Sequence, residues 1–139
     1  MALVNAWPLN DGSGTTAADV IGSVDGTLNG TNPPAWVNDA TRPNGAGFIV
    51  QFDATAEKID LPSTLNVPAS DFTICCWAKN GAWPTTGNDL RFISKASGVS
   101  EVQHIFMLGH TITNPDYRAR ARFRASSSGN TFYSEPSTP

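Results

Sequence analysis

The sequence has few charged residues and no long hydrophobic run. Charged side chains make up 15% of its 139 residues, and no segment approaches the roughly 20 apolar residues that a membrane-spanning helix needs. No stretch of ten residues has the 3.6-residue hydrophobic period of an amphipathic helix. These absences argue against a helical bundle and against membrane insertion, and they favour a β-rich domain.

Export signals and disulfides are also lacking. The sequence begins Met1-Ala2-Leu3-Val4 without a basic segment followed by an apolar one, so we expect no classical signal peptide in this chain. A disulfide between the neighbouring Cys75 and Cys76 would be strained, so we predict two small buried hydrophobic residues there. No Cys and His spacing is typical of a zinc site.

Glycine and proline are plentiful, at 12 and 10 residues, and they separate short segments in which residue character alternates. A period of two predicts β-strands. The predicted strands are Leu3–Leu9, Gly26–Asn29, Phe48–Asp53, Lys58–Leu61, Phe72–Lys79, Leu90–Lys95, Val102–Leu108, Tyr117–Ala125 and Thr131–Ser134. Because Phe72–Lys79 is apolar on both faces, we expect it to be a central strand covered on both sides.

An ordered set of short motifs runs through about residues 3 to 80. The motifs are Trp7-Pro8-Leu9-Asn10-Asp11-Gly12-Ser13-Gly14, Asp19, Asp25-Gly26-Thr27-Leu28, Phe52-Asp53, Ile59-Asp60-Leu61 and Asp71-Phe72-Thr73-Ile74 with Trp77. As a set they resemble the laminin G-like, concanavalin A-like modules. The resemblance implies an all-β fold, a two-sheet antiparallel jelly-roll β-sandwich over residues 1–133, followed by a Pro- and Ser-rich tail at 134–139.

The same resemblance implies a binding scaffold and does not fix one activity. Such modules are attached to secreted enzymes, adhesins and virion proteins, so we expect a non-catalytic module that contacts glycans, outside cells or on a virion. Two alternatives stay open: a structural or decoration protein of a virus particle or appendage, and a domain associated with a glycoside hydrolase. Family members continue for several more strands, so we expect a sandwich that is incomplete at its C-terminus or completed by a neighbouring chain.

Arginine occupies every second position between Tyr117 and Ala125. This alternation places four arginines on one strand face and Ala119, Ala121 and Phe123 on the other, against the core. The four are Arg118, Arg120, Arg122 and Arg124. The rest of the chain holds 12 acidic and five basic residues, so this stripe is a local reversal of charge.

Guanidinium groups bind carboxylate, sulfate and phosphate groups through paired hydrogen bonds. We therefore predict that the arginine stripe binds a glycan or other anionic polymer, or an acidic protein surface. The alternative is pairing with Glu101 or Asp116 at a solvated sheet edge. The net charge of −3 argues against nucleic acid as the partner.

Two aspartates are candidate ligands for a structural Ca²⁺ ion, which prefers carboxylate and carbonyl oxygens. The resemblance places Asp19 and Asp25 in the loop where relatives often hold calcium, although Val20 and Ile21 replace the small polar residues expected after Asp19. The alternative is that these aspartates cap turns through hydrogen bonds.

Exposed aromatic residues stack on sugar rings, and Trp83 is the best candidate, with Trp7, Trp36 and Trp77 predicted in the core. Retaining glucanases need two carboxylates held about 5 to 5.5 Å apart, and no Glu-x-Asp-x-Glu motif occurs here. His104 and His110 have no nucleophile motif nearby, so we predict structural roles for both. We expect no catalytic residues.

Overall fold

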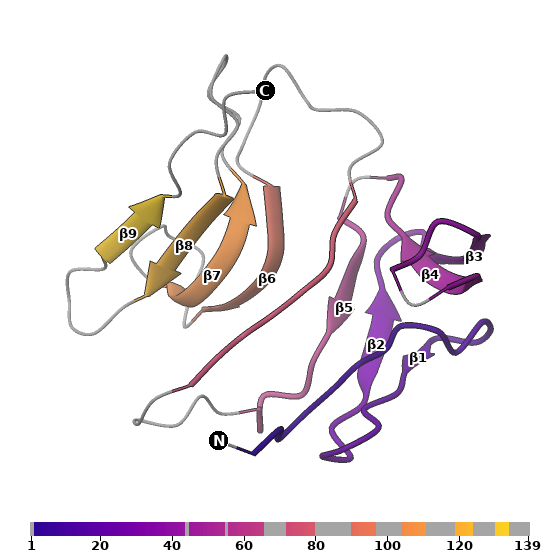
Figure 1. The fold of residues 1–139 in the computed structure, drawn as a ribbon, viewed down its shortest axis with the longest axis horizontal. Helices are drawn as coiled ribbons and strands as arrows, with labels where there is room; N and C mark the ends of the chain where they lie inside the picture. Colours follow the sequence, from indigo (N-terminus) through magenta and orange to yellow (C-terminus); the bar gives the residue numbers. More distant parts are fainter. Residues whose placement is uncertain are drawn as a thin grey trace. The chain divides into compact units, whose positions relative to one another are not determined.

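The structure is a computed structural model, and it describes residues 2–43, 45–54, 56–65, 72–79, 90–96, 104–110, 119–123 and 130–133. The chain divides into two compact units, Met1–Phe72 and Thr73–Pro139 (Figure 1). The described residues form three antiparallel sheets and no helix, so the prediction of an all-β fold is confirmed. Within this described part of the chain, no helix could span a membrane.

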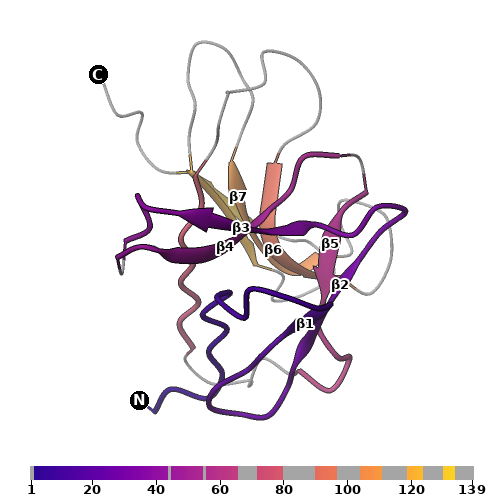
Figure 2. The ribbon, with the colours of Figure 1, turned by 90° about the vertical axis from the view of Figure 1, so that its right-hand side faces the viewer.

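The first unit holds two small sheets. A three-stranded sheet has the order β1-β2-β5, and β3 pairs with β4 in a hairpin. Their bounds are β1 (Thr16–Ala17), β2 (Gly26–Asn29), β3 (Ala35–Asp39), β4 (Gly47–Gln51) and β5 (Lys58–Asp60). The hairpin strands run across the direction of the three-stranded sheet (Figure 2).

The core of the three-stranded sheet follows from the alternation in β2. Gly26 and Leu28 are buried, whereas Thr27 and Asn29 are exposed. Leu28 and Ala17 are 3% and 0% exposed. Position 26 favours glycine because an added Cβ would lie 2.7 Å from Cγ2 of Ile59 on the neighbouring strand, closer than two carbon atoms pack, so the Ile59 side chain would have to shift.

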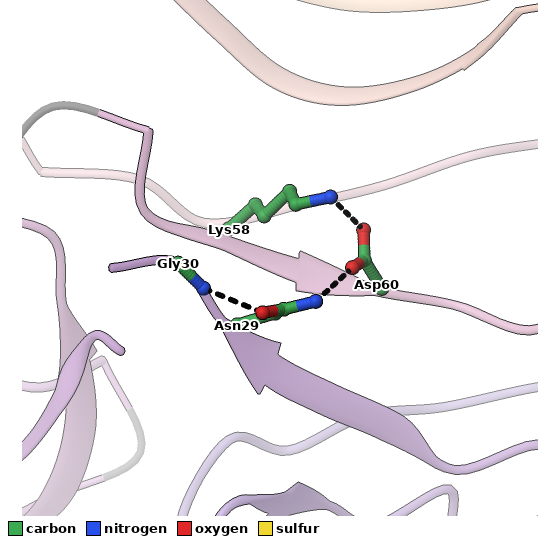
Figure 3. Close-up of polar contacts among 4 residues, drawn as sticks. All are labelled: Asn29, Gly30, Lys58 and Asp60. Carbon is green, nitrogen blue, oxygen red and sulfur yellow. Dashed lines mark hydrogen bonds and ion pairs between the residues drawn. The ribbon is translucent and has the colours of Figure 1, made fainter. Parts of the chain in front are cut away.

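Polar contacts join the ends of β2 and β5 (Figure 3). Asn29 Nδ2 donates to Asp60 Oδ2 at 2.8 Å, and Lys58 Nζ lies 2.9 Å from Asp60 Oδ1. The hydrogen bond from Lys58, followed by the one from Asn29, lowers the pKa of the Asp60 carboxyl. The Gly30 amide donates to Asn29 Oδ1 at 2.7 Å, which orients the asparagine for its contact with Asp60.

The glycine-rich loop after Asn10 lies against the β3–β4 hairpin. Gly12 has a φ of +79°, and a Cβ there would lie 2.7 Å from Cδ2 of Phe48 in β4. The Trp36 indole N–H donates to the Gly14 carbonyl at 2.9 Å. The loop therefore depends on the absence of a side chain at Gly12 and on an anchor from β3.

The second unit contains one four-stranded sheet in the order β6-β7-β8-β9. The strands are β6 (Leu90–Ala96), β7 (His104–His110), β8 (Ala119–Phe123) and β9 (Asn130–Tyr133). The interior strand β7 supplies the best buried apolar residues, with Phe106 and Met107 at 3% and 1% exposure.

The predicted strand Leu3–Leu9 is wrong, because the structure has no strand there. Side-chain contacts hold this segment instead: the Ala6 amide donates to Asp19 Oδ1, and the Trp7 indole N–H donates to the Val24 carbonyl at 2.8 Å. Leu9 adopts a left-handed φ of 53°, which ends any extended run.

Trp7 and Trp36 are each half-buried, so they are only partly core residues.

The predicted central strand Phe72–Lys79 is also wrong, since these described residues belong to no strand. Trp77 is 87% exposed, and Cys75 and Cys76 are both exposed free thiols, in contrast to the predicted burial. Partial desolvation, followed by the neighbouring Cys75, raises the pKa of the Cys76 thiol. The apolar composition of this segment suits a strand, but no described strand pairs with it.

Candidate functional site

Three arginines share one face of the four-stranded sheet. Gly109 of β7 lies between Arg91 of β6 and Arg120 of β8, and Met107 lies beside Arg122. Residues directly opposite each other in antiparallel strands project to the same face, as do residues two apart on one strand. Arg91, Arg120 and Arg122 therefore lie on one face, which we call the arginine face. Arg118 and Arg124 lie outside the described residues.

Arg91 reaches this face because β6 carries a bulge. Arg91 pairs with Gly109 and Ile93 with Leu108, so β6 advances two residues while β7 advances one. The extra residue is Phe92, which is 40% exposed. Bulges re-aim side chains in this way and occur often beside functional sites. Strict alternation cannot reveal a bulge, so no pattern in the sequence pointed to Arg91.

The arginine face is partly covered. Arg120 is 9% exposed and Met107, which lies beside Arg122, is 1% exposed, whereas Arg122 is half-buried and Arg91 is exposed. The prediction that Ala119 packs against the core is wrong, because Ala119 is exposed while Arg120 is buried. Interactions within the chain involve all three arginines, so the face is a positioned cluster and not an open stripe along one strand.

The strand that carries the arginines is an interior strand. β8 pairs with β7 on one side and with β9 on the other. The alternative prediction of a solvated sheet edge is therefore wrong for residues 119–123. Glu101 and Asp116, the acids proposed as its partners, lie outside the described residues.

Charge divides sharply between the two units. Residues 1–72 contain eight acidic and two basic residues, and residues 73–139 contain four acidic and seven basic ones. The described strands of the second unit carry Arg91, Lys95, Arg120 and Arg122, and their described residues include no Asp or Glu. The arginine face therefore lies in a locally positive unit of a chain whose net charge is −3.

His110 lies on the opposite face of the sheet. It pairs with Ala119, which precedes Arg120 on β8 and therefore projects to the other face. It is 6% exposed, and burial lowers its pKa. The imidazole is therefore neutral at pH 7 and adds no charge to the arginine face. The buried, neutral side chain of His110 fits the predicted structural role. The side chain of His104 is not among those that the structure describes.

Asp19 organises the loops around it through an unusually dense set of hydrogen bonds. Its Oδ1 accepts from the amides of Ala6 at 2.9 Å and Ile21 at 3.1 Å, and its Oδ2 accepts from the Val24 amide at 3.1 Å and from Asn5 Nδ2. Burial opposes ionisation, but the hydrogen bonds from Ala6, Asn5, Gly22 and Ile21 outweigh it, so the pKa of Asp19 falls far below its usual range.

These contacts suit turn capping better than calcium binding. Both oxygens of Asp19 are surrounded by N–H donors, and Asp25 Oδ1 accepts from the Asp19 amide at 2.9 Å. A Ca²⁺ ion would have to displace donors that point at the same lone pairs. Among the described residues, no three His, Cys, Asp or Glu side chains are grouped so as to hold a metal. Calcium at Asp19 and Asp25 therefore stays a prediction for direct measurement.

The aromatic candidate from the sequence, Trp83, lies outside the described residues. The structure instead exposes Trp77, which sequence reasoning assigned to the core. Comparison of the chain with protein-family models, curated proteins and solved structures finds no significant match.

Proposed function

We propose that this chain is a non-catalytic binding module of the jelly-roll, concanavalin A-like type, and that the arginine face contacts an anionic glycan. The observation that supports this is the register of β6, β7 and β8, which gathers Arg91, Arg120 and Arg122 on one face. Such a module works outside cells or on the surface of a virion.

The spacing of the three arginines suits an extended anionic ligand. Two strand spacings separate Arg91 from Arg120, so their Cα atoms lie about 10 Å apart, and Arg120 and Arg122 lie about 7 Å apart along one strand. Gly109 between Arg91 and Arg120 adds no side chain between them. Carboxylate or sulfate groups along a polysaccharide can reach Arg91 and Arg122, while the buried Arg120 raises the local positive potential.

Titration calorimetry with a heparin-derived oligosaccharide tests this proposal. We expect binding that weakens steeply between about 0.05 and 0.5 M salt, because exposed charges are screened. The same protein should give no heat with uncharged dextran. Binding to dextran with salt-independent affinity would count against the arginine face as the contact surface.

Single substitutions locate the contact. Arg91→Gln and Arg122→Gln should each weaken binding roughly fivefold, because each removes one charged donor at a partly exposed position. Lys58→Gln is the matched control: it also removes one positive charge, but from an exposed ion pair in the first unit. An equal loss in Lys58→Gln would assign the effect to net charge alone.

A structural role in a particle or appendage is the second candidate. The exposure of Trp77 on an uncharged segment favours contacts with other protein chains over an isolated module. A glycan array distinguishes the two candidates, since reproducible binding to acidic glycans supports recognition. Silence on the array together with a stable assembly contact supports the structural role.

A further inference from the structure

Asn29 and Gly30, at the end of β2, hold two groups that can react with each other. The Gly30 amide donates to Asn29 Oδ1 at 2.7 Å, and a C=O bond is about 1.23 Å long. The Gly30 nitrogen therefore lies no more than about 3.9 Å from Cγ of Asn29. This is close to the separation of about 3 to 3.5 Å from which one atom attacks another.

The backbone at position 30 favours glycine, so the fold itself keeps the Asn–Gly sequence. Gly30 has a φ of +137°, and an added Cβ would lie 3.0 Å from the carbonyl oxygen of Ala56. A residue with a side chain is strained at such a φ. The missing side chain also leaves the Gly30 nitrogen uncrowded as a nucleophile.

Asp60 holds the Asn29 side chain in place (Figure 3). Asn29 Nδ2 donates to Asp60 Oδ2 at 2.8 Å, and Lys58 Nζ lies 2.9 Å from Asp60 Oδ1. Both ends of the carboxamide are thereby fixed, with Oδ1 toward Gly30 and Nδ2 toward Asp60. Asn29 is exposed, so solvent reaches it as the base and as the reactant that amide chemistry needs.

We propose that Asn29–Gly30 is a site of spontaneous deamidation in the native protein, and that the reaction breaks the hydrogen bond between Asn29 and Asp60. The site lies in the first unit and uses none of the residues of the arginine face. It is therefore independent of the glycan proposal.

The reaction needs only this dipeptide and water. A hydroxide ion takes the proton of the Gly30 N–H, the nitrogen forms a bond to Asn29 Cγ, and the bond between Cγ and Nδ2 breaks. The leaving nitrogen takes a proton from water and departs as ammonia, which regenerates the hydroxide ion and leaves a cyclic imide. Water then opens the imide at either carbonyl and gives aspartate or isoaspartate at position 29.

The product opposes the contact that joins β2 to β5. A carboxylate at position 29 has no N–H to donate to Asp60, and like charges on neighbouring strands repel. Lys58 can neutralise only one of the two carboxylates. Isoaspartate also adds a carbon atom to the backbone at the residue that pairs with Lys58, so either product should loosen this end of the three-stranded sheet.

Peptide mapping of the full chain, kept folded in mildly alkaline buffer, tests the reaction. A protease that cleaves before aspartate releases residues 25–38, in which Asn29–Gly30 is the only Asn–Gly pair. The aspartate product is cut again before residue 29, and the isoaspartate product keeps its length but gains the mass difference between OH and NH₂. We expect the native chain to react at least as fast as a synthetic peptide of residues 25–38. A slower native rate would show that the strand protects Asn29 and would overturn the proposal.

Asn29→Asp reproduces one product and tests its effect on the sheet. Its melting temperature in low salt should lie roughly 3 °C below that of the wild type. Asn38→Asp is the matched control, because it makes the same charge change at an exposed position of β3 opposite the uncharged Phe48. Equal melting temperatures in the two variants would overturn the effect on β2 and β5, and a loss confined to Asn29→Asp supports it.

Discussion

The Ala6 amide donates a hydrogen bond of 2.9 Å to the carboxylate of Asp19, which lies 13 residues further along the chain. In return, the Val20 amide donates to the Ala6 carbonyl at 2.9 Å. This reciprocal pair fastens the N-terminal segment to the loop that precedes β2. Asp19, one of the residues on which the resemblance to laminin G-like modules depends, therefore has a structural role that needs no ligand.

Replacing Asp19 by Asn should destabilise the first unit. In the asparagine variant, an NH₂ group replaces one of the two carboxylate oxygens. The N–H groups that donate to that oxygen in the wild type then face another donor, so at least one buried backbone N–H loses its acceptor. We expect the melting temperature, followed by circular dichroism, to fall by roughly 5 to 10 °C. Asp11→Asn is the control, because the contact of Asp11 with the Ala18 amide is exposed and long, at 3.4 Å. Equal shifts in the two variants would contradict the role of Asp19.

Acid should destabilise the protein partly through Asp19. Its folded pKa lies far below the ordinary value because hydrogen bonds outweigh the effect of burial. A carboxyl whose folded pKa is depressed stabilises the fold fully above its unfolded pKa of roughly 4, and loses this contribution as the pH falls further toward the folded pKa. Melting temperatures measured from pH 6 to pH 2 should fall more steeply below pH 4 in the wild type than in Asp19→Asn. Parallel curves would rule out Asp19 as a source of the acid sensitivity.

Calcium offers a direct check of the same geometry. Because the Asp19 oxygens already accept the amides of Ala6, Ile21 and Val24, we expect identical melting in millimolar CaCl₂ and in a chelator. A rise in melting temperature with calcium that Asp19→Asn abolishes would restore the calcium site that the resemblance implies. Magnesium at the same concentration controls for ionic strength.

Alternation in the sequence predicted most of the strands, because each of them combines period-two patterning with turn residues at both ends. β2 matches its predicted bounds, and β4 to β9 lie within a few residues of theirs. β1, with two residues, is too short to carry a pattern. β3 was missed: Trp36 was predicted as a core residue, although it pairs with Val50 in a strand.

The two strands that were predicted wrongly show what local patterning omits. Leu3–Leu9 and Phe72–Lys79 both have a strand-like composition, but a strand exists only where a second strand accepts its hydrogen bonds. In the first case the Asp19 carboxylate binds the Ala6 amide. In the second, the described residues supply no partner strand.

The arginine face was half predictable. That Arg120 and Arg122 share a face follows from their spacing alone. The contribution of Arg91 depends on a bulge between Arg91 and Ile93, and the burial of Arg120 depends on what covers the sheet. Neither feature leaves a trace in local alternation.

Gly26→Ala should destabilise the three-stranded sheet strongly for so small a change. The added Cβ would lie 2.7 Å from Ile59 Cγ2 and 3.0 Å from Leu61 Cδ2, and both side chains lie in or directly after β5, so both would have to shift within the packing between β2 and β5. Overpacking of this kind costs about 1 to 3 kcal/mol.

Gly47→Ala is the matched control at a second strand glycine, because the closest neighbour of its added Cβ, at 2.9 Å, is Nη1 of the flexible Arg42 side chain. Urea unfolding should give a lower midpoint with an unchanged slope for Gly26→Ala and a midpoint near wild type for Gly47→Ala. If both variants unfold at the same urea concentration, the close packing of β2 on β5 is not what limits stability.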